Sequence, residues 1–373
     1  MKIRGINAAA IGSLAASEAS EFCIRDFSGP LTGGLGAALV CDRNNSRPEM
    51  SKPCQAPPKA SLFHEYWWLE AATAGRFSEV EVRHGDHLVG RLPFSEVKRN
   101  GLRHLCMPDF THVLGPLVDS GDGKPQTRMM NRLSTVESLI KRLPPFDFLR
   151  LVVDPLADDG LTTIDAVAFQ IHGFQVGHQC TFHLDCRADL KILQAGMESR
   201  VRQNIRRAEE RLTVKTVDDP DRFVRFYLDN LRKANRKSYM PFNQFFALFS
   251  ECQARNCGLA LAAMQPSGAP VAMTFIVWDS NTMYYLLTTR APDEKDNGSV
   301  SLLIWSAMRR AHDLGLTLDL DGVTTAGTAR FLSGFGGAPR MRQVITGGRP
   351  FYNMVQSVKT ILRCGRPFRS SFD

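Results

Sequence analysis

Apolar and polar residues alternate in two separate parts of the chain, and each alternating stretch is broken by a turn. In the first stretch Val80 and Val82 alternate with polar residues, the "HGD" turn follows, and the chain returns over Leu88–Phe94. Residues 259–279 repeat this pattern around a turn at Pro266–Gly268, and "DSN" then leads into a third strand. Period-two alternation around turn residues predicts β-hairpins. The recurrence of hairpin, strand and helix predicts an internal repeat, once in each half of the chain.

Other stretches have the helical period or a strand-like run. "SLFHEYWWLEAATAG" predicts a first helix that stops at Gly75, and Pro241 separates two further helices. Further helices are expected at residues 127–143, 189–212, 221–240, 242–256 and from Val300, and strands at 146–154, 167–171, 179–184 and 316–321.

Composition and spacing divide the chain into four segments. Residues 1–60 predict a disordered leader and linker, because 41–60 are rich in proline and polar residues and lack periodicity. We expect one domain over residues 61–186, a second over 187–350 and a basic tail over 351–373. The first residues make a poor signal peptide, because Ile6–Ala16 contains few large apolar residues.

The overall balance is that of a soluble protein, with 43% hydrophobic and 23% charged residues. No apolar run reaches the roughly eighteen residues of a membrane span, so no integral membrane segment is expected. The net charge of +8 favours anionic partners, although a basic protein without such a partner has the same charge. Nine scattered cysteines without a CxxC pair favour reduced thiols and a cytoplasmic location.

One local group of histidines and cysteines raises the question of a metal. "HQCTFHLDC" contains His178, Cys180, His183 and Cys186. Strand alternation puts His178 and Cys180 on one face and His183 on the other. We therefore interpret them as ordinary strand residues and expect no metal.

The helix predicted at 189–212 has two different faces. Val201, Ile205, Ala208 and Leu212 share an apolar stripe, while arginines occupy other positions, including Arg200, Arg202, Arg206, Arg207 and Arg211. This basic surface fits either a solvated face or a helix that contacts an anion.

A loop between a strand and a helix is the candidate site for phosphate groups. The third strand of the second hairpin unit ends at Arg290, and the next helix begins just after a glycine. Glycine lets backbone N–H groups approach a ligand, and a helix N-terminus favours negative charge. The candidate residues are Arg290, Asn297, Gly298, Ser299, Val300 and Ser301. Many strand–loop–helix units carry such a glycine without binding a ligand.

The strand after that helix carries two acids, in "LTLDLDGVTTAG". Asp319 and Asp321 alternate with leucines, so both point to one face. Two close carboxylates do not both ionise freely, so we expect one to have a raised pKa and to act as a proton acceptor. The alternative is structural: Asp321 holds the turn before Gly322, and Thr324 or Thr325 caps the next helix.

The order of these motifs resembles the GNAT superfamily of N-acyltransferases. It covers the hairpin, the strand "YYLLTTR", the loop "NGS", the helix "LLIWSAMRRAHDLG", the strand "LDLDG" and "FGG". More narrowly, "SRVRQNIRRAEERLTV" and "FHEYWWLEA" are similar to the domain starts of the Fem-type branch, the peptidoglycan-bridge transferases and their acyl-CoA-using relatives. The resemblance covers about residues 61–346. It implies an α/β (α+β) fold of two tandem GNAT-like domains, each a mixed, mostly antiparallel sheet flanked by helices.

The resemblance also implies roles for the motif residues. The pyrophosphate of an acyl-CoA co-substrate, such as acetyl-CoA, would lie on the backbone at Gly298–Ser301. Backbone near Leu286 and Leu287 would polarise its thioester. The acceptor would lie near Asp319 and Asp321, with Tyr284, Tyr285 and Arg206 as candidate substrate-binding residues.

These inferences lead to one main hypothesis and two alternatives. The main one is an acyltransferase, most simply an N-acyltransferase, that acts on a small-molecule, glycan or peptide precursor of the cell envelope. In the first alternative, aminoacyl-tRNA replaces acyl-CoA as donor, although no long helical arm is present to support it. In the second, the chain is a non-catalytic scaffold. None of the three gives DNA a role.

Overall fold

The structure is a computed structural model that describes residues 61–99, 101–154, 157, 160–238, 240–292 and 298–348. The predicted leader and linker at 1–60 and the basic tail at 351–373 lie outside these residues. Within the described part, no helix is long and apolar enough to cross a membrane.

The first half of the chain follows the predicted hairpin–strand–helix order. Its elements are η2 (Leu62–His64), α2 (Tyr66–Thr73), β1 (Phe77–His84), β2 (His87–Arg99), β3 (Leu102–Cys106), β4 (Leu117–Val118), α3 (Pro125–Lys141), β5 (Phe148–Val153), α4 (Thr163–Ile171) and β6 (Gln175–Asp185). Helix α2 ends where predicted, because Ala74 and Gly75 both adopt the left-handed conformation.

The second half has the same element order, preceded in the chain by an additional group of helices. Its elements are α5 (Leu190–Gly196), α6 (Ser199–Glu209), β7 (Thr213–Thr216), α7 (Pro220–Lys233), α8 (Phe242–Ala254), β8 (Gly258–Met264), β9 (Pro270–Trp278), β10 (Thr282–Arg290), α9 (Ser299–Asp313), β11 (Thr317–Gly322), α10 (Ala326–Ser333) and β12 (Ala338–Gly348). The predicted repeat is therefore confirmed: β1, β2, β3, α3, β5, α4 and β6 correspond to β8, β9, β10, α9, β11, α10 and β12.

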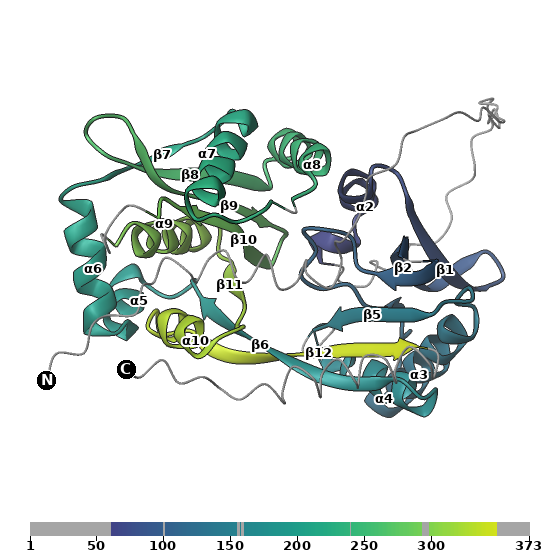
Figure 1. Ribbon diagram of the computed structural model, residues 1–373. Helices are drawn as coiled ribbons and strands as arrows, with labels where there is room; N and C mark the ends of the chain where they lie inside the picture. The colour runs from purple at the N-terminus through teal and green to yellow at the C-terminus, as the bar shows by residue number, and fades with distance from the viewer. Residues whose placement is uncertain are drawn as a thin grey trace, which may run out of the picture.

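The strands form one sheet in the order β1-β2-β3-β5-β12-β6-β11-β10-β9-β8-β7, and β4 pairs with β2 (Figure 1). The last strand of each half pairs with a strand of the other half: β6 pairs with β11, and β12 pairs with β5. The two exchanged strands, β6 and β12, also pair with each other at the centre of the sheet. The described ladders are antiparallel except β3 with β5 and β10 with β11. The fold thus consists of two halves with the same element order, whose mixed, mostly antiparallel sheets are joined edge to edge.

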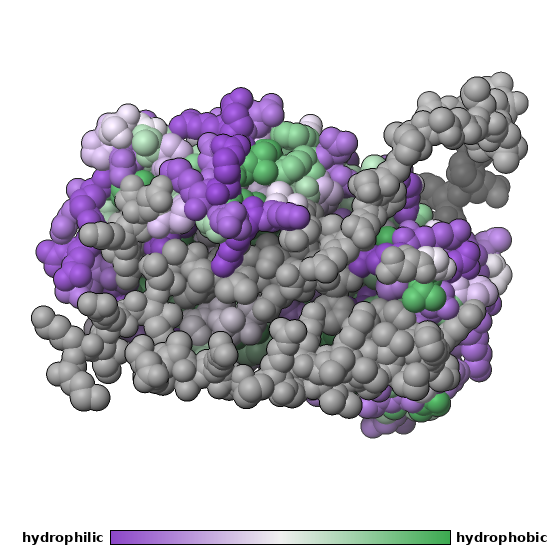
Figure 2. Space-filling view, viewed as in Figure 1, coloured by the Kyte–Doolittle hydropathy of each residue, from purple (hydrophilic) through white to green (hydrophobic). Residues whose placement is uncertain are grey.

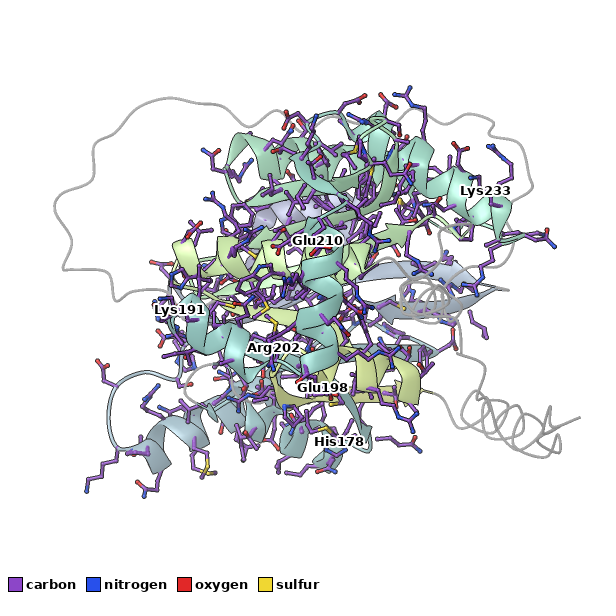
Figure 3. The ribbon with its side chains drawn as sticks, turned by 90° about the vertical axis from the view of Figure 1, so that its left-hand side faces the viewer. His178, Lys191, Glu198, Arg202, Glu210 and Lys233 are labelled. Atoms are coloured by element: carbon purple, nitrogen blue, oxygen red, sulfur yellow. The ribbon has the colours of Figure 1, made fainter. Side chains whose placement is uncertain are left out.

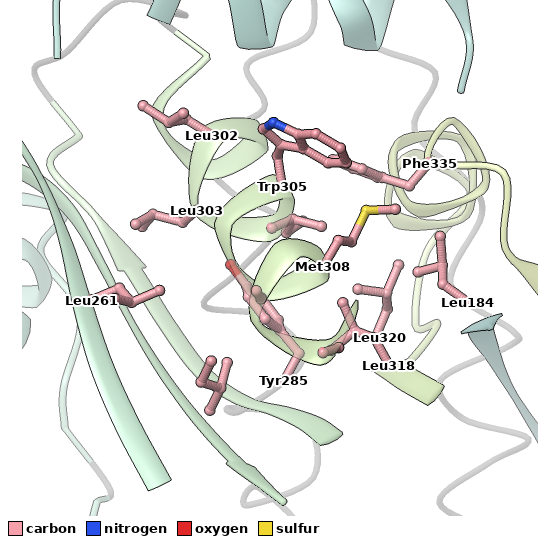
Figure 4. Close-up of a cluster of buried hydrophobic side chains, with 14 of the residues drawn as sticks. Leu184, Leu261, Tyr285, Leu302, Leu303, Trp305, Met308, Leu318, Leu320 and Phe335 are labelled. Carbon is pink, nitrogen blue, oxygen red and sulfur yellow. The ribbon is translucent and has the colours of Figure 1, made fainter. Parts of the chain in front are cut away.

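Helices cover both faces of the second-half sheet and bury most of its apolar side chains. Helix α9 lies on one face, where Leu302, Leu303, Trp305 and Met308 pack against strand residues such as Leu318 (Figure 4). The predicted stripe of α6 belongs to the same cluster, with Val201, Ile205, Ala208 and Leu212 all buried. Helices α2, α7 and α8 contribute to the cluster on the other face.

Two predicted elements are wrong. Residues 167–171, expected as a strand, belong to helix α4, because Asp165, Ala166 and Phe169 are buried together on one helical face. The single basic helix expected at 189–212 is two helices, α5 and α6, separated by Met197 in extended conformation. The turn after α10 docks at this break, where the Glu198 N–H donates to the Gly334 carbonyl at 2.9 Å.

Candidate active site

Strands β10 and β11 begin as a pair and then part. Their parallel pairing covers only Thr282–Tyr284 with Thr317–Asp319, although β10 continues to Arg290 and β11 to Gly322. A register shift between Tyr285 and Leu287 further disturbs β10. Where a parallel pair opens, backbone N–H and C=O groups can turn to a ligand between the strands. The opening starts at Tyr284 and Asp319.

Asp319 lies at this point in a buried polar cluster. Its side chain accepts hydrogen bonds from Thr181 Oγ1 at 2.6 Å and from the Asp321 N–H at 2.9 Å. His183 Nε2 lies 3.2 Å from Asp319 Oδ2, and the Arg342 guanidinium forms an ion pair with the same oxygen. Asp319 and Arg342 are each only 2% exposed. Both oxygens of the Asp319 carboxylate therefore have polar partners.

The partners decide the charge of Asp319. Burial is the largest single influence and raises its pKa, but the Arg342 charge, His183 and Thr181 together outweigh burial, so the pKa lies well below its usual range. The predicted raised pKa is therefore wrong for Asp319, because Arg342 binds both acids, with its Nη1 3.4 Å from Asp321 Oδ1. An ionised carboxylate in a buried ion pair is a poor proton acceptor at neutral pH.

Asp321 interacts with the first half of the chain. It has a left-handed backbone with φ of 69°, where the register of β11 against β6 breaks. His112 Nδ1 lies 3.5 Å from Asp321 Oδ1, and burial lowers the pKa of His112. The helix cap predicted at Thr324 or Thr325 is confirmed at Thr325, whose hydroxyl accepts the Thr328 N–H at 3.1 Å. Asp321 thus lies near the end of β11, at the tip of the strand as predicted, and the helix cap is Thr325.

A cavity of about 330 Å³ lies beside this cluster, between the two halves. First-half residues form one wall, second-half residues from the starts of β10 and β11 form another, and β6 and β12 complete the lining. Its polar residues include His64, Arg132, Asp154, Thr162, His183, Arg187, Asp279, Asn281, Thr282, Tyr284, Thr317 and Arg340. Asp319 and Asp321 are absent from the lining, and His183, which contacts Asp319, takes part in it.

The three predicted substrate-binding residues differ in position. Tyr284 lines the cavity, and its hydroxyl donates to Asp279 Oδ2 at 3.2 Å. Tyr285 points to the opposite face of β10, into the apolar cluster of Figure 4, where burial raises its pKa to about 12. Arg206 is 84% exposed on α6 and pairs with Glu210. The structure therefore brings only Tyr284 to the cavity, because strand alternation turns Tyr285 away and Arg206 lies on a solvated helix face.

The predicted phosphate-binding residues lie at the other end of the opening. Arg290 ends β10, Asn297 lies outside the described residues, and Gly298 precedes α9 with φ of 75°. A Cβ on Gly298 would lie 2.4 Å from the Asn204 carbonyl oxygen of α6. The glycine therefore has a packing role of its own, in bringing α6 against the start of α9.

The first turn of α9 is largely buried. Ser299 and Ser301 are 1% and 2% exposed, and Val300 is half-buried. Their role toward a donor remains a prediction. Among the described residues, no group of three or more histidine, cysteine or acidic side chains is placed to hold a metal ion.

Sequence reasoning missed most partners of Asp319. Thr181 and His183 come from β6, where Thr181 precedes Asp319 by 138 residues, and Arg342 comes from β12, 23 residues after Asp319. His183 was noticed only as a metal candidate. The one available signal was the alternation of Arg340 and Arg342 in "PRMRQ", which predicts two arginines on one strand face but not their partner.

Comparisons with known proteins support the fold and the motif order of the second half. Residues 196–330 match the family model described as an acetyltransferase (GNAT) domain. The crystal structure of FemX is similar, with a TM-score of 0.60, 12% sequence identity, and coverage of 81% of this chain and 96% of that chain. The C-terminal domain (DUF2156) of a putative lysylphosphatidylglycerol synthetase from Agrobacterium fabrum has a TM-score of 0.52 and 12% identity, and the match covers 80% of this chain and 93% of that one. No curated protein sequence matches the chain.

At these identities the solved structures establish the fold, and the family model establishes a GNAT domain in the second half. The match at 196–330 lies within the part of the chain where the motif order is found. The predicted resemblance to the tandem GNAT, Fem-type branch is confirmed at this level.

Proposed function

We propose that this chain, which carries a GNAT domain on a fold shared with FemX, is an acyltransferase that uses an acyl-CoA as its donor. It transfers the acyl group, most simply acetyl, to an amine or a hydroxyl of a cell-envelope sugar, polysaccharide or peptide precursor. We place this activity in the cytoplasm, where acyl-CoA and reduced thiols are available.

The observation that carries the proposal is the position of Tyr284. It lies where β10 and β11 part, within the segment that matches the GNAT domain, and it also lines the cavity between the halves. A donor in the opening and an acceptor in the cavity would therefore meet beside this residue. Holding two reactants in contact is the main catalytic contribution in a direct transfer.

Each reactant has groups suited to it. On the donor side, Arg290 and the start of α9 offer positive charge to phosphates, and backbone near Leu286 and Leu287 offers hydrogen bonds to the thioester carbonyl. On the acceptor side, the cavity is lined by side chains of both charges and by hydroxyls such as Thr282, which suit a polar sugar or peptide. Transfer is direct, so no covalent enzyme intermediate is required.

Native mass spectrometry of the full chain with acetyl-CoA and longer acyl-CoAs tests the donor. We expect a one-to-one complex with at least one thioester, weakened in Arg290→Ala. If no acyl-CoA binds even at millimolar concentration, the proposal is wrong.

A second candidate donor, aminoacyl-tRNA, is favoured by one surface feature. The exposed side of α6 carries arginines between Glu198 and Glu210, and hydrophilic side chains surround it (Figures 2 and 3). Such a face can bind phosphates through their charge. Filter binding with charged tRNA distinguishes the donors, because tRNA binding must weaken steeply with salt and fail when the exposed arginines are replaced.

A further inference from the structure

His183 is the side chain that connects the buried cluster with the cavity. It projects from β6 opposite Asp319 of β11, in the same register position. Its Nε2 lies 3.2 Å from Asp319 Oδ2, and its side chain is 19% exposed and lines the cavity. One end of the imidazole is therefore held by a buried carboxylate, and the ring reaches the space where an acceptor would bind.

The carboxylate fixes the tautomer of this ring. Asp319 is ionised, so it accepts a hydrogen bond and Nε2 carries the hydrogen. The neutral ring then has its lone pair on Nδ1. Within the described part of the chain, no group forms a hydrogen bond with Nδ1. The ring is thus arranged as a proton acceptor, with its orientation set by a residue that is itself fixed by Arg342 and Thr181.

We propose that His183 is the general base of the transfer reaction, an inference that rests on the proposed function, and that Asp319 is a positioning residue. The acceptor nitrogen or oxygen attacks the thioester carbonyl carbon, so a C–N or C–O bond forms and the C–S bond breaks. The electron pair of the C–S bond leaves with coenzyme A as a thiolate. The proton of the attacking group goes to His183 Nδ1 and then to the thiolate or to water.

Several charged and titratable groups line the cavity with His183 or belong to the buried cluster at Asp319. They are Asp319 on β11, Arg340 and Arg342 on β12, Arg187 after β6, His64, Arg132 and Asp154 of the first half, and Tyr284 and Asp279 of the second half. Three of the arginines are paired: Arg342 with Asp319, Arg187 with Asp185 at 2.9 Å, and Arg132 with Asp165 at 2.7 Å. Among the described residues, no carboxylate pairs with Arg340.

His183→Gln is the most informative variant. A glutamine amide can still donate to Asp319 from the position of Nε2, but it cannot accept a proton at neutral pH. The assay measures thiol release from acetyl-CoA with D-glucosamine, or with the first amine of a sugar and peptide panel that is acetylated. We expect kcat to fall about 10²-fold or more with little change in KM, and the step in the pH–rate profile to disappear.

Two further variants separate catalysis from structure. Asp319→Asn keeps the imidazole, so it should retain more activity than His183→Gln and shift the pH–rate step instead of removing it. His178→Gln is the matched control: His178 is an exposed residue of the same strand (Figure 3), and its replacement should leave rate and profile unchanged.

The outcomes distinguish this inference from the function on which it rests. If the wild type consumes acetyl-CoA and His183→Gln keeps its rate and its pH step, His183 is not the base, whereas the proposed function stands. If the wild type consumes no thioester, the proposed function fails and the role of His183 fails with it. A measurement without turnover is also available: diethyl pyrocarbonate should modify His183 in the folded protein but not the buried His104, which lies outside the cavity lining, and an unmodified His183 would contradict an accessible Nδ1.

Discussion

Arg342 of β12 forms an ion pair with Asp319 of β11, although β6 lies between these two strands in the sheet. Both side chains are 3% exposed. The pair therefore ties together the two strands next to the central crossover, where the halves of the chain exchange strands. It also supplies the counter-charge that keeps Asp319 ionised beside His183.

Arg342→Met should strongly destabilise the protein. The change leaves Asp319 buried without its counter-charge, and removing one member of a buried pair costs about 3–5 kcal/mol. Urea denaturation of the two proteins gives the difference in free energy of unfolding. Arg340→Met is the control, because Arg340 lies on the same face of β12 but is exposed. Its replacement should change the free energy of unfolding by no more than about 0.5 kcal/mol. A loss no larger for Arg342 than for Arg340 would show that the pair contributes nothing.

His64 should make stability depend on pH between about 4 and 6.5. Burial lowers its pKa from 6.5 to about 4 in the folded protein, where the ring contacts Gly115 and Ser61. The unfolded chain takes up the proton first as pH falls, so stability is full above pH 6.5 and falls toward pH 4, by roughly 3 kcal/mol. Unfolding curves over this range test the slope. His64→Gln should flatten it and exposed His84→Gln should not; equal slopes in all three proteins would contradict the assignment.

Gly298→Ala should separate helix α6 from the start of α9. Its new Cβ would meet the Asn204 carbonyl at 2.4 Å, and the φ of 75° adds strain. Gly315 at the other end of α9 has a similar φ of 67° but open space around it, so Gly315→Ala carries the strain alone, about 1 kcal/mol. Thermal unfolding should show a clearly larger loss of stability for Gly298→Ala than for Gly315→Ala. Equal losses of stability in the two variants would mean that α6 shifts away from the new Cβ without a cost in free energy.

The sequence predicted the local elements well because their signals are local. The two hairpins, the helix after Gly298 and the strand that carries Asp319 each have their own periodicity and turn residues. The strand predicted at residues 167–171 was wrong because a short apolar run fits a strand or a buried helix equally. The burial of Asp165 and Phe169 on one helical face, with Asp165 paired to Arg132, decides for the helix.

The site could be predicted only in part because its charges come from distant strands. Alternation correctly placed Asp319 and Asp321 toward a common partner, but it could not identify that partner as Arg342. The expected raised pKa followed from considering two acids without a cation. His183 was set aside because its neighbour in space, Asp319, is 136 residues away along the chain, a separation that pattern reasoning does not bridge.

Arg290→Ala should weaken donor binding specifically. Loss of one cation near the phosphates should raise the Kd for acetyl-CoA about tenfold, or more at low salt. Isothermal titration calorimetry measures this change. Arg225→Ala removes an equally charged residue from the exposed side of α7 and should leave the Kd unchanged. Equal affinity in both variants would mean that the donor does not reach the end of β10.

We propose that a thioester in the opening between β10 and β11 reacts with an acceptor in the cavity. The most direct test is acceptor-dependent thiol release from acetyl-CoA, compared between the wild type and Thr282→Trp, which fills the cavity from the start of β10. We expect that the wild type releases thiol only when an acceptor is present, and that Thr282→Trp binds acetyl-CoA normally but releases none. Thiol release that continues unchanged in Thr282→Trp, or a wild type that releases none with any acceptor, would contradict it.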